Sequence, residues 1–224
     1  MEGMCPGPRV LFYPCCGDDI EEAIVRFVDS VDVFWFVNLE FVPCSERNAR
    51  QIRSNEDGAH GLATAASIRP IGRPSVRRDP EDVVEYRGVT HSDSYLHAPT
   101  MRPIVIHRRR GEGVDTFQRS VPRIDVFYYR GDRPGEGGSG KLFLGREIFE
   151  ELILLRLVRG GLVVTDGSQC EDPFTNLAEF HPRRGRKCDE PELAARPFNA
   201  LGLEFICVGR LGDRYGPTLI WRVE

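Results

Sequence analysis

Residues 9–38 read RVLFYPCCGDDIEEAIVRFVDSVDVFWFVN, and this stretch decides the fold. It begins with a short apolar run at 9–14 and ends with a run at 31–38 that is rich in β-branched and aromatic residues. Between them, apolar side chains recur at helical spacing; they are Ile20, Ala23, Ile24, Phe27, Val28 and Val31. A strand, a helix and a strand in succession predict a βαβ unit, with parallel strands and a right-handed crossover.

The second half of the chain continues this alternation of strands and helices. In chain order the patterns predict a strand at 102–110, a helix at 113–121, a strand at 124–132, a helix at 144–159, a strand at 162–168, a short helix at 191–202 and strands at 204–212 and 217–224. The turn between the last two strands predicts an antiparallel hairpin. We therefore predict a single α/β domain over residues 1–224, a Rossmann-like, doubly wound, mostly parallel sheet with a C-terminal antiparallel hairpin.

Residues 43–100 differ from the rest, because they are rich in Arg, Ser, Gly, Pro and Asp and have weak apolar periodicity. A structureless span of this length is unusual inside a compact domain. We expect an irregular insertion or lid within the domain, with a helix near 45–53 and with short strands or a hairpin.

The composition indicates an ordinary soluble protein, with 29% charged residues and a net charge of −4. This charge argues against nucleic acid as a partner, although arginines and lysines cluster at 108–110 and 183–187. No N-terminal signal is visible, and no apolar run approaches the roughly 20 residues that span a membrane. We expect a cytoplasmic protein that binds a small-molecule ligand and no membrane; its oligomeric state stays open.

The cysteines indicate free thiols, because there are seven of them and no C-x-x-C pair. Cys170, His181 and Cys188 share one polar loop, but structural zinc sites use closely spaced ligand pairs. No metal is therefore expected.

A ligand site is expected where the parallel strands end, because ligands of open α/β sheets bind at the carboxyl ends of the strands. The candidate residues are Cys16, Gly17, Asp18 and Asp19 after the first strand, Asn38 and Glu40 after the second, Asp132, Gly137 and Gly138 after the strand at 124–132, and Asp166 and Ser168 after the strand at 162–168. The alternative interpretation is that these residues only form turns and helix caps.

The glycine-rich run GEGGSGK at 135–141 has the spacing of a loop that binds nucleotide phosphates. Such a loop needs Ser or Thr at its next position to bind magnesium, and Leu142 stands there. The four residues GDRP at 131–134 also separate the apolar part of the preceding strand from Gly135, where a phosphate loop turns at once. A nucleotide-binding protein is therefore an alternative, and a flexible loop beside the ligand is the preferred interpretation.

The strand and helix order, with the terminal hairpin FICVGRLGDRYGPTLIWRVE at 205–224, resembles the class I S-adenosylmethionine-dependent methyltransferases. The resemblance implies that the cofactor lies over CCGDD at 15–19, with Asp18 or Asp19 near its amino group. It also implies that Glu40 or Asn38 binds the ribose. GGLVVTDGS at 160–168 looks like a later strand of that family. The chain is also similar to uncharacterised bacterial proteins that pair a YP..G.D turn with a VTDGS strand.

Two other functions remain open, because the sequence identifies no catalytic residue. The first is a non-catalytic protein of the same fold that binds a small ligand or a partner. The second is nucleophilic catalysis by Cys15 or Cys16 at a helix N-terminus, where the pKa of a thiol can be lowered. The histidines considered as its general base are His91, His97 and His107.

Overall fold

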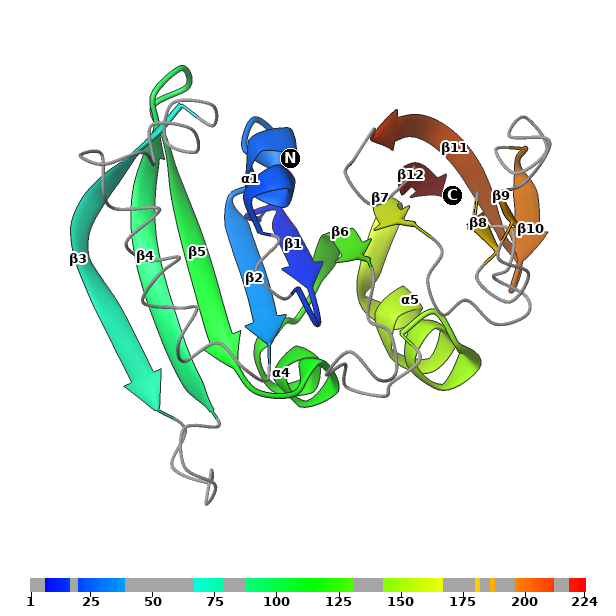
Figure 1. The fold of residues 1–224 in the computed structure, drawn as a ribbon, viewed down its shortest axis with the longest axis horizontal. Coiled ribbons are helices and arrows are strands. Elements are labelled where there is room, and N and C mark those ends of the chain that lie inside the picture. The colour runs from blue at the N-terminus through cyan, green and yellow to red at the C-terminus, as the bar shows by residue number, and fades with distance from the viewer. Residues whose placement is uncertain are drawn as a thin grey trace, which may run out of the picture.

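The computed structural model describes residues 7–16, 20–38, 67–78, 88–130, 143–166, 180–181, 186–187, 196–211 and 218–224. Most strands of this part form one ten-stranded sheet, in the order β10-β11-β12-β7-β6-β1-β2-β5-β4-β3 (Figure 1). They are β1 (Val10–Tyr13), β2 (Val33–Asn38), β3 (Ile68–Arg78), β4 (Val89–His97), β5 (Arg102–Arg110), β6 (Ile124–Tyr129), β7 (Leu157–Thr165), β10 (Phe198–Ala200), β11 (Leu203–Leu211) and β12 (Thr218–Val223). A separate antiparallel pair joins β8 (Phe180–His181) to β9 (Arg186–Lys187).

The centre of the sheet is parallel. β1 pairs with β2 on one side and with β6 on the other, β2 pairs with β5, and β6 pairs with β7. The strands from β2 to β5 all lie on one side of β1, and the chain then returns to add β6 and β7 on its other side. This reversal is a topological switch point, and it lies between β1 and β6.

Both margins of the sheet are antiparallel. β12, β11 and β10 extend it beyond β7, while β4 and β3 extend it beyond β5. Among the described strands of the sheet, five neighbouring pairs are antiparallel and four are parallel. The C-terminal hairpin is the pair of β11 and β12. β3 and β4, which extend the sheet beyond β5, lie inside the segment 43–100.

The helices of the described residues are few and short. They are α1 (Glu21–Phe27), α4 (Gly113–Ser120) and the π-helix η1 (Arg146–Ile153), which continues into α5 (Leu154–Arg156). The prediction of a Rossmann-like, doubly wound, mostly parallel α/β fold is therefore wrong: the structure is dominated by a mixed sheet. None of these helices is long and apolar enough to cross a membrane.

Two segments predicted as helices contain strand residues. The helix expected at 144–159 ends at Arg156, and β7 begins at Leu157, which pairs with Ile124 of β6. Gly160 has a φ of +73°, and the register of β6 and β7 shifts around it, so this glycine marks a bulge and not the end of a helix. Within the short helix expected at 191–202, Phe198–Ala200 form β10.

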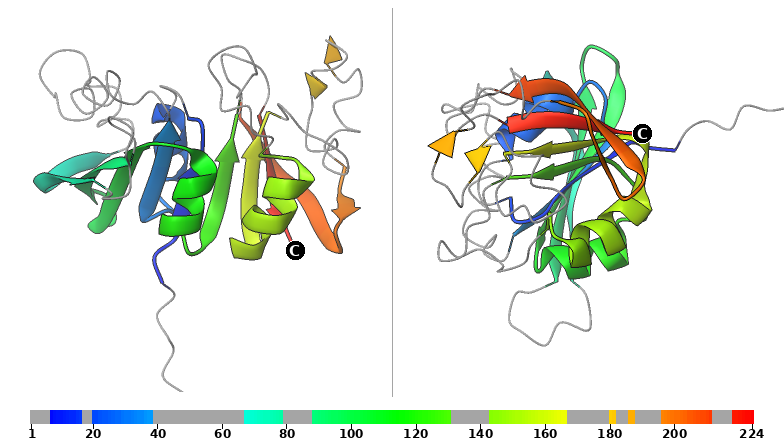
Figure 2. Two further views of the ribbon diagram at one scale, coloured as in Figure 1. Left: turned by 90° about the horizontal axis from the view of Figure 1, so that it is seen from below. Right: turned by 90° about the vertical axis from the view of Figure 1, so that its right-hand side faces the viewer.

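The two faces of the sheet carry separate cores. Figure 2 shows α1 on one side of the sheet and α4 and α5 on the other. We call the side that packs against α1 the α1 face and the other side the α4 face. On the α1 face the core includes Leu11, Tyr13, Phe34, Phe36 and Tyr128 with Ile24 and Phe27 of the helix. On the α4 face it includes Phe12, Phe127 and Trp221 with Phe117 of α4 and Phe149 of η1. The central strands are buried on both sides, which explains their continuous apolar sequences.

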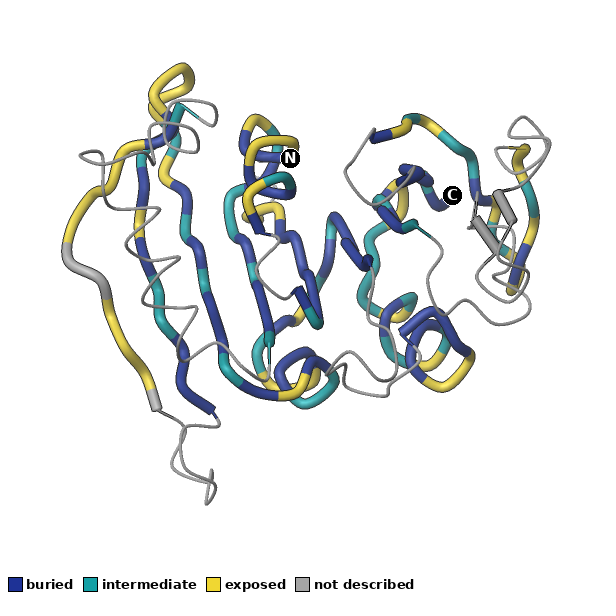
Figure 3. The backbone as a smooth tube through the Cα atoms, viewed as in Figure 1, coloured by how far each residue is buried: buried dark blue, intermediate teal, exposed yellow. Residues whose placement is uncertain are grey.

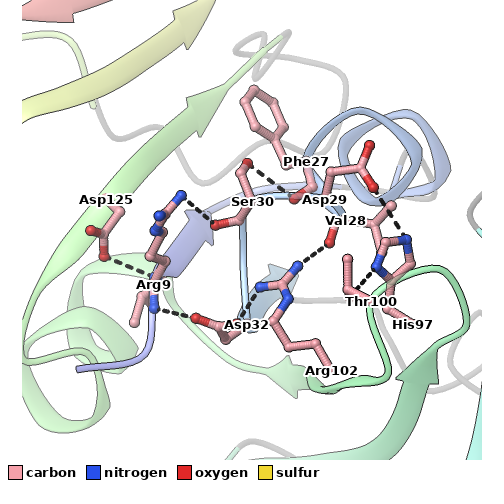
Figure 4. Close-up of polar contacts among 11 residues, drawn as sticks. Arg9, Phe27, Val28, Asp29, Ser30, Asp32, His97, Thr100, Arg102 and Asp125 are labelled. Atoms are coloured by element: carbon pink, nitrogen blue, oxygen red, sulfur yellow. Dashed lines mark hydrogen bonds and ion pairs between the residues drawn. The ribbon is translucent and has the colours of Figure 1, made fainter. Parts of the chain in front are cut away.

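A polar network joins α1, β2 and β5 at the amino ends of the parallel strands (Figure 4). The Asp32 carboxylate accepts a hydrogen bond of 2.8 Å from the Arg9 backbone N–H and forms an ion pair with Arg102. Arg102 also donates to the carbonyl oxygen of Val28 at the end of α1. This network fixes the turn between α1 and β2 at the edge opposite the expected ligand site.

Candidate functional site

The carboxyl ends of the parallel strands meet at one edge of the sheet. Two backbone hydrogen bonds of 3.1 Å hold the chain there: the Cys16 N–H donates to Val37 of β2, and the Gly111 N–H donates to Asn38. The first joins the turn after β1 to β2, and the second joins β2 to the chain after β5. Three strand ends are thus fixed beside one another.

The turn after β1 has an unusual backbone conformation. Cys15 has a φ of 54°, in the left-handed region that costs a residue other than glycine about 1 to 3 kcal/mol. Cys15 packs half-buried on the α4 face, whereas Cys16 is buried on the α1 face. This turn directs the chain from β1 to the start of α1 at the carboxyl edge.

An ion pair bridges the switch point between β1 and β6. Glu22, in the first turn of α1, lies 2.7 Å from a terminal guanidinium nitrogen of Arg130, directly after β6. The Arg130 side chain is only 4% exposed and that of Glu22 is 31% exposed. The same Arg130 nitrogen lies 3.4 Å from the hydroxyl oxygen of Tyr128. A buried cation is therefore held beside a partly accessible carboxylate where a ligand is expected.

The arginines at the end of β5 bind the protein itself. Arg108 is fully buried on the α1 face and forms an ion pair with Asp93 of β4. Arg109 is buried on the α4 face, where it donates to Thr116 of α4 at 2.9 Å and to Thr90 of β4 at 3.2 Å. These two members of the basic cluster at 108–110 hold α4 and β4 against β5.

His107 lies in a row of side chains that crosses three strands on the α4 face. Its Nδ1 is hydrogen-bonded to the Ser92 hydroxyl of β4 at 2.7 Å, and its ring stacks on Trp35 of β2 with centroids 4.1 Å apart. Burial lowers the pKa of His107 to about 4, so the ring is neutral at pH 7.

His97, another histidine considered as a general base, lies at the edge of the sheet opposite Cys15 and Cys16. His97 lies in the network at the amino ends of the strands, where it contacts Thr100 at 2.8 Å and Asp29 at 3.2 Å (Figure 4). The hypothesis of a cysteine nucleophile with a histidine base therefore gains no geometric support from His97 or His107.

Only three of the sequence-predicted site residues are described. Cys16, Asn38 and Asp166 lie at the ends of β1, β2 and β7, and all three strands end at the carboxyl edge. Outside the described residues lie Gly17, Asp18, Asp19, Glu40, Asp132, Gly137, Gly138 and Ser168, together with the phosphate-loop run at 135–141 and Leu142. The nucleotide-binding interpretation of that run stays a prediction.

Glu22 and Arg130 were not among the predicted ligand-binding residues. Glu22 lies in the helix predicted within the run at 9–38, and Arg130 lies inside the strand predicted at 124–132. No sequence signal linked them, because neither residue stood at a predicted strand end and 108 positions separate them in the sequence.

Metal binding has no support in the described part of the chain, where no three His, Cys, Asp or Glu side chains form a group that could hold an ion. Cys170 and Cys188, two of the three residues considered as zinc ligands, lie outside the described residues. Comparison of the sequence with models of known protein families finds no match, and comparison with curated proteins finds none. The candidate site therefore rests on the fold and on the residues of the carboxyl edge.

Proposed function

We propose that this protein binds S-adenosylmethionine at the carboxyl edge of its parallel strands and transfers the methyl group to an acceptor. The observation that carries the proposal is the ion pair of Glu22 and Arg130 at the switch between β1 and β6. Ligands of open sheets with parallel strands bind at such a switch point. A cation and a carboxylate side by side also complement an α-amino acid group, which carries one charge of each sign.

The polar groups of the ion pair suit the two ends of that amino acid group. The Glu22 carboxylate accepts hydrogen bonds from the ligand ammonium, and the Arg130 guanidinium donates to the ligand carboxylate. Hydrogen bonds with charged partners contribute about 1.5 to 3 kcal/mol each. Asn38 ends β2. The resemblance to class I methyltransferases implies that a residue at this position binds the ribose.

In the proposed reaction, an electron pair of the acceptor atom forms a bond to the methyl carbon of the sulfonium. The bond between that carbon and sulfur breaks, and its electrons stay on sulfur, so S-adenosylhomocysteine leaves. The protein's described residues bind and orient the cofactor, while the acceptor is left unassigned.

The second candidate is a protein that binds the same ligand without transferring a methyl group. It is favoured by the nature of the Glu22–Arg130 pair, which recognises charge but supplies no reacting atom. The two candidates differ in one measurement, because only the first produces S-adenosylhomocysteine when protein, cofactor and an acceptor preparation are incubated together.

Calorimetric titration with S-adenosylmethionine and S-adenosylhomocysteine tests both candidates. Glu22→Gln should weaken binding by about tenfold or more, since it removes one charge-assisted contact. Glu224→Gln is the control for the loss of an ion pair elsewhere, because Glu224 forms a more exposed pair of 2.6 Å with Arg222 of β12. Thermal unfolding of each variant reports whether the fold is intact. Absence of binding at millimolar ligand, or equal effects of the two variants, would reject the proposal.

A further inference from the structure

The ten-stranded sheet is open, and among the described strands it ends at β3 on one margin and at β10 on the other. The outer side of an edge strand carries backbone N–H and C=O groups that can pair with a strand of another chain. The direction of these groups, and the positions that lack an N–H, therefore decide whether a further strand can add to the sheet.

β3 is the longer of the two edges. It has eleven residues and is exposed along most of its length (Figure 3). Two large apolar side chains on it are exposed, those of Ile71 at 38% and Val76 at 57%. A long, exposed edge strand with apolar side chains is a typical site of edge-to-edge association.

The pairing of β3 with β4 shows which backbone groups of β3 face outward. The Ala98 N–H donates to the Ser67 carbonyl oxygen at 2.8 Å, so the backbone polar groups of Ser67 face β4. In an antiparallel pair, positions that face the partner strand alternate with positions that face away. Pro70 lies three positions after Ser67 in the same register, opposite Tyr95, and therefore faces away from β4. The outer edge of β3 thus lacks an N–H at Pro70.

A bulge interrupts the same edge directly after Pro70. The register of β3 and β4 shifts between Ile71 and Ser75. Within the shift Gly72 has a φ of +73°, a left-handed conformation that is typical of bulges, and Pro74 is a second residue without an N–H. Bulges twist an edge strand away from the path that a pairing strand follows.

β10, the edge strand at the other margin, is short. It consists of the three residues Phe198–Ala200, and Pro197 directly precedes it. A strand of this length offers few backbone groups to a further strand, and Pro197 supplies no N–H that would extend the pairing. Both margins therefore carry features that oppose strand addition, and the longer margin carries more of them.

We propose that Pro70 and the bulge that contains Pro74 close the outer edge of β3 to strand addition, so that two copies of this chain do not pair edge to edge. A proline at an outward position removes a donor from the outer edge and leaves the pairing with β4 intact, because its N–H would point away from β4. If the prolines served only the local shape of the bulge, their loss would change stability without association. The proposal does not depend on the cofactor proposal, since β3 and the ion pair of Glu22 and Arg130 share no residue.

Sedimentation velocity of the native chain and of a Pro70→Thr, Pro74→Thr double variant tests the proposal, at concentrations from about 1 to about 100 μM. Threonine favours strands, and it restores both N–H groups without adding an apolar surface. The average mass of the variant should rise with concentration to about twice that of the native chain, as pairing of two identical edges requires. Pro122→Thr is the matched control, because Pro122 is exposed between α4 and β6, outside the sheet, and it should sediment like the native chain.

A third substitution distinguishes edge pairing from general aggregation. Every second residue of β4 counted back from Ala98 faces β3, so Val76, which pairs with His91, faces outward. Adding Val76→Pro to the double variant places a proline on the outer edge again and should reverse the association. Pro70→Thr alone, which leaves the bulge in place, should associate more weakly than the double variant, and it provides the test if thermal unfolding shows that the double variant does not fold.

Three outcomes would overturn the proposal. The first is that the folded variants sediment like the native chain at about 100 μM. The second is that Pro122→Thr associates as strongly as the double variant. The third is that association of the double variant is unchanged by Val76→Pro, which would place the contact elsewhere on the molecule.

Discussion

Protonation of His107 should destabilise the protein as the pH falls from 7 to 5. Burial lowers the pKa of His107 to about 4, whereas in the unfolded chain it returns to its ordinary value of 6.5. Between these two values the unfolded chain binds a proton that the folded protein does not. The stability that the neutral ring contributes is therefore full above pH 6.5 and is lost as the pH falls towards 4.

The size of the effect follows from the two pKa values. The fall from 6.5 to about 4 corresponds to about 3 kcal/mol once the protonated unfolded state dominates. About half of this loss develops between pH 7 and pH 5, which corresponds to about 1 to 2 kcal/mol.

Urea unfolding of the native protein and of His107→Gln, each at pH 7 and pH 5, isolates this contribution. Glutamine retains a group that can hydrogen-bond to Ser92 but does not titrate. The other acid-sensitive groups are common to both proteins, so the native protein should lose about 1 to 2 kcal/mol more than the variant. An equal loss in both proteins, or an NMR titration that places the pKa of His107 near 6.5, would refute the reasoning.

Three further substitutions test the packing. Asp93→Asn should cost about 3 kcal/mol or more by denaturant unfolding, because the fully buried Arg108 guanidinium loses its carboxylate; a cost below about 1 kcal/mol would contradict this. Gly113→Ala should cost about 1 to 3 kcal/mol, because the new Cβ would lie 2.6 Å from Cζ of Phe143. Adding Phe143→Leu should recover part of that loss, and no recovery would exclude this clash as the cause. Asp32→Asn should cost about 1 to 2 kcal/mol and lower the melting temperature, since two hydrogen-bond donors converge on that carboxylate; an unchanged melting temperature would argue against it.

The buried centre of the fold was predictable from the sequence. The run at 9–38 forms β1, α1 and β2 as its pattern indicates, because strands buried on both faces keep continuous apolar sequences. The C-terminal hairpin was predictable for a local reason, since its two paired strands follow one another closely in the sequence.

The margins were not predictable in the same way. β3 is exposed along most of its length, so its sequence IRPIGRPSVRR shows no apolar alternation, and its pairing with β4 supplies the order. The start of β7 lies inside the apparent helical period, and pairing of Leu157 with Ile124 overrides that local pattern. Long-range pairing of this kind leaves no periodic signal, and it accounts for the mixed character of the sheet.

The candidate site shows the same division. Strand ends at one edge followed from the parallel order, and Cys16, Asn38 and Asp166 lie there. The ion pair of Glu22 and Arg130 depends on α1 folding back over β6, and no motif in the sequence signals such a contact.

The most direct test of the account is an NMR titration of the isotope-labelled protein with S-adenosylhomocysteine, which locates the ligand on the fold. We predict that the backbone amide signals of Cys16, Asn38, Arg130 and Asp166, at the carboxyl edge, shift with one common affinity. The signal of Asp32, at the opposite edge, should stay in place. Shifts confined to other parts of the sheet, or no shift at millimolar ligand, would contradict the assignment of this edge as the binding site.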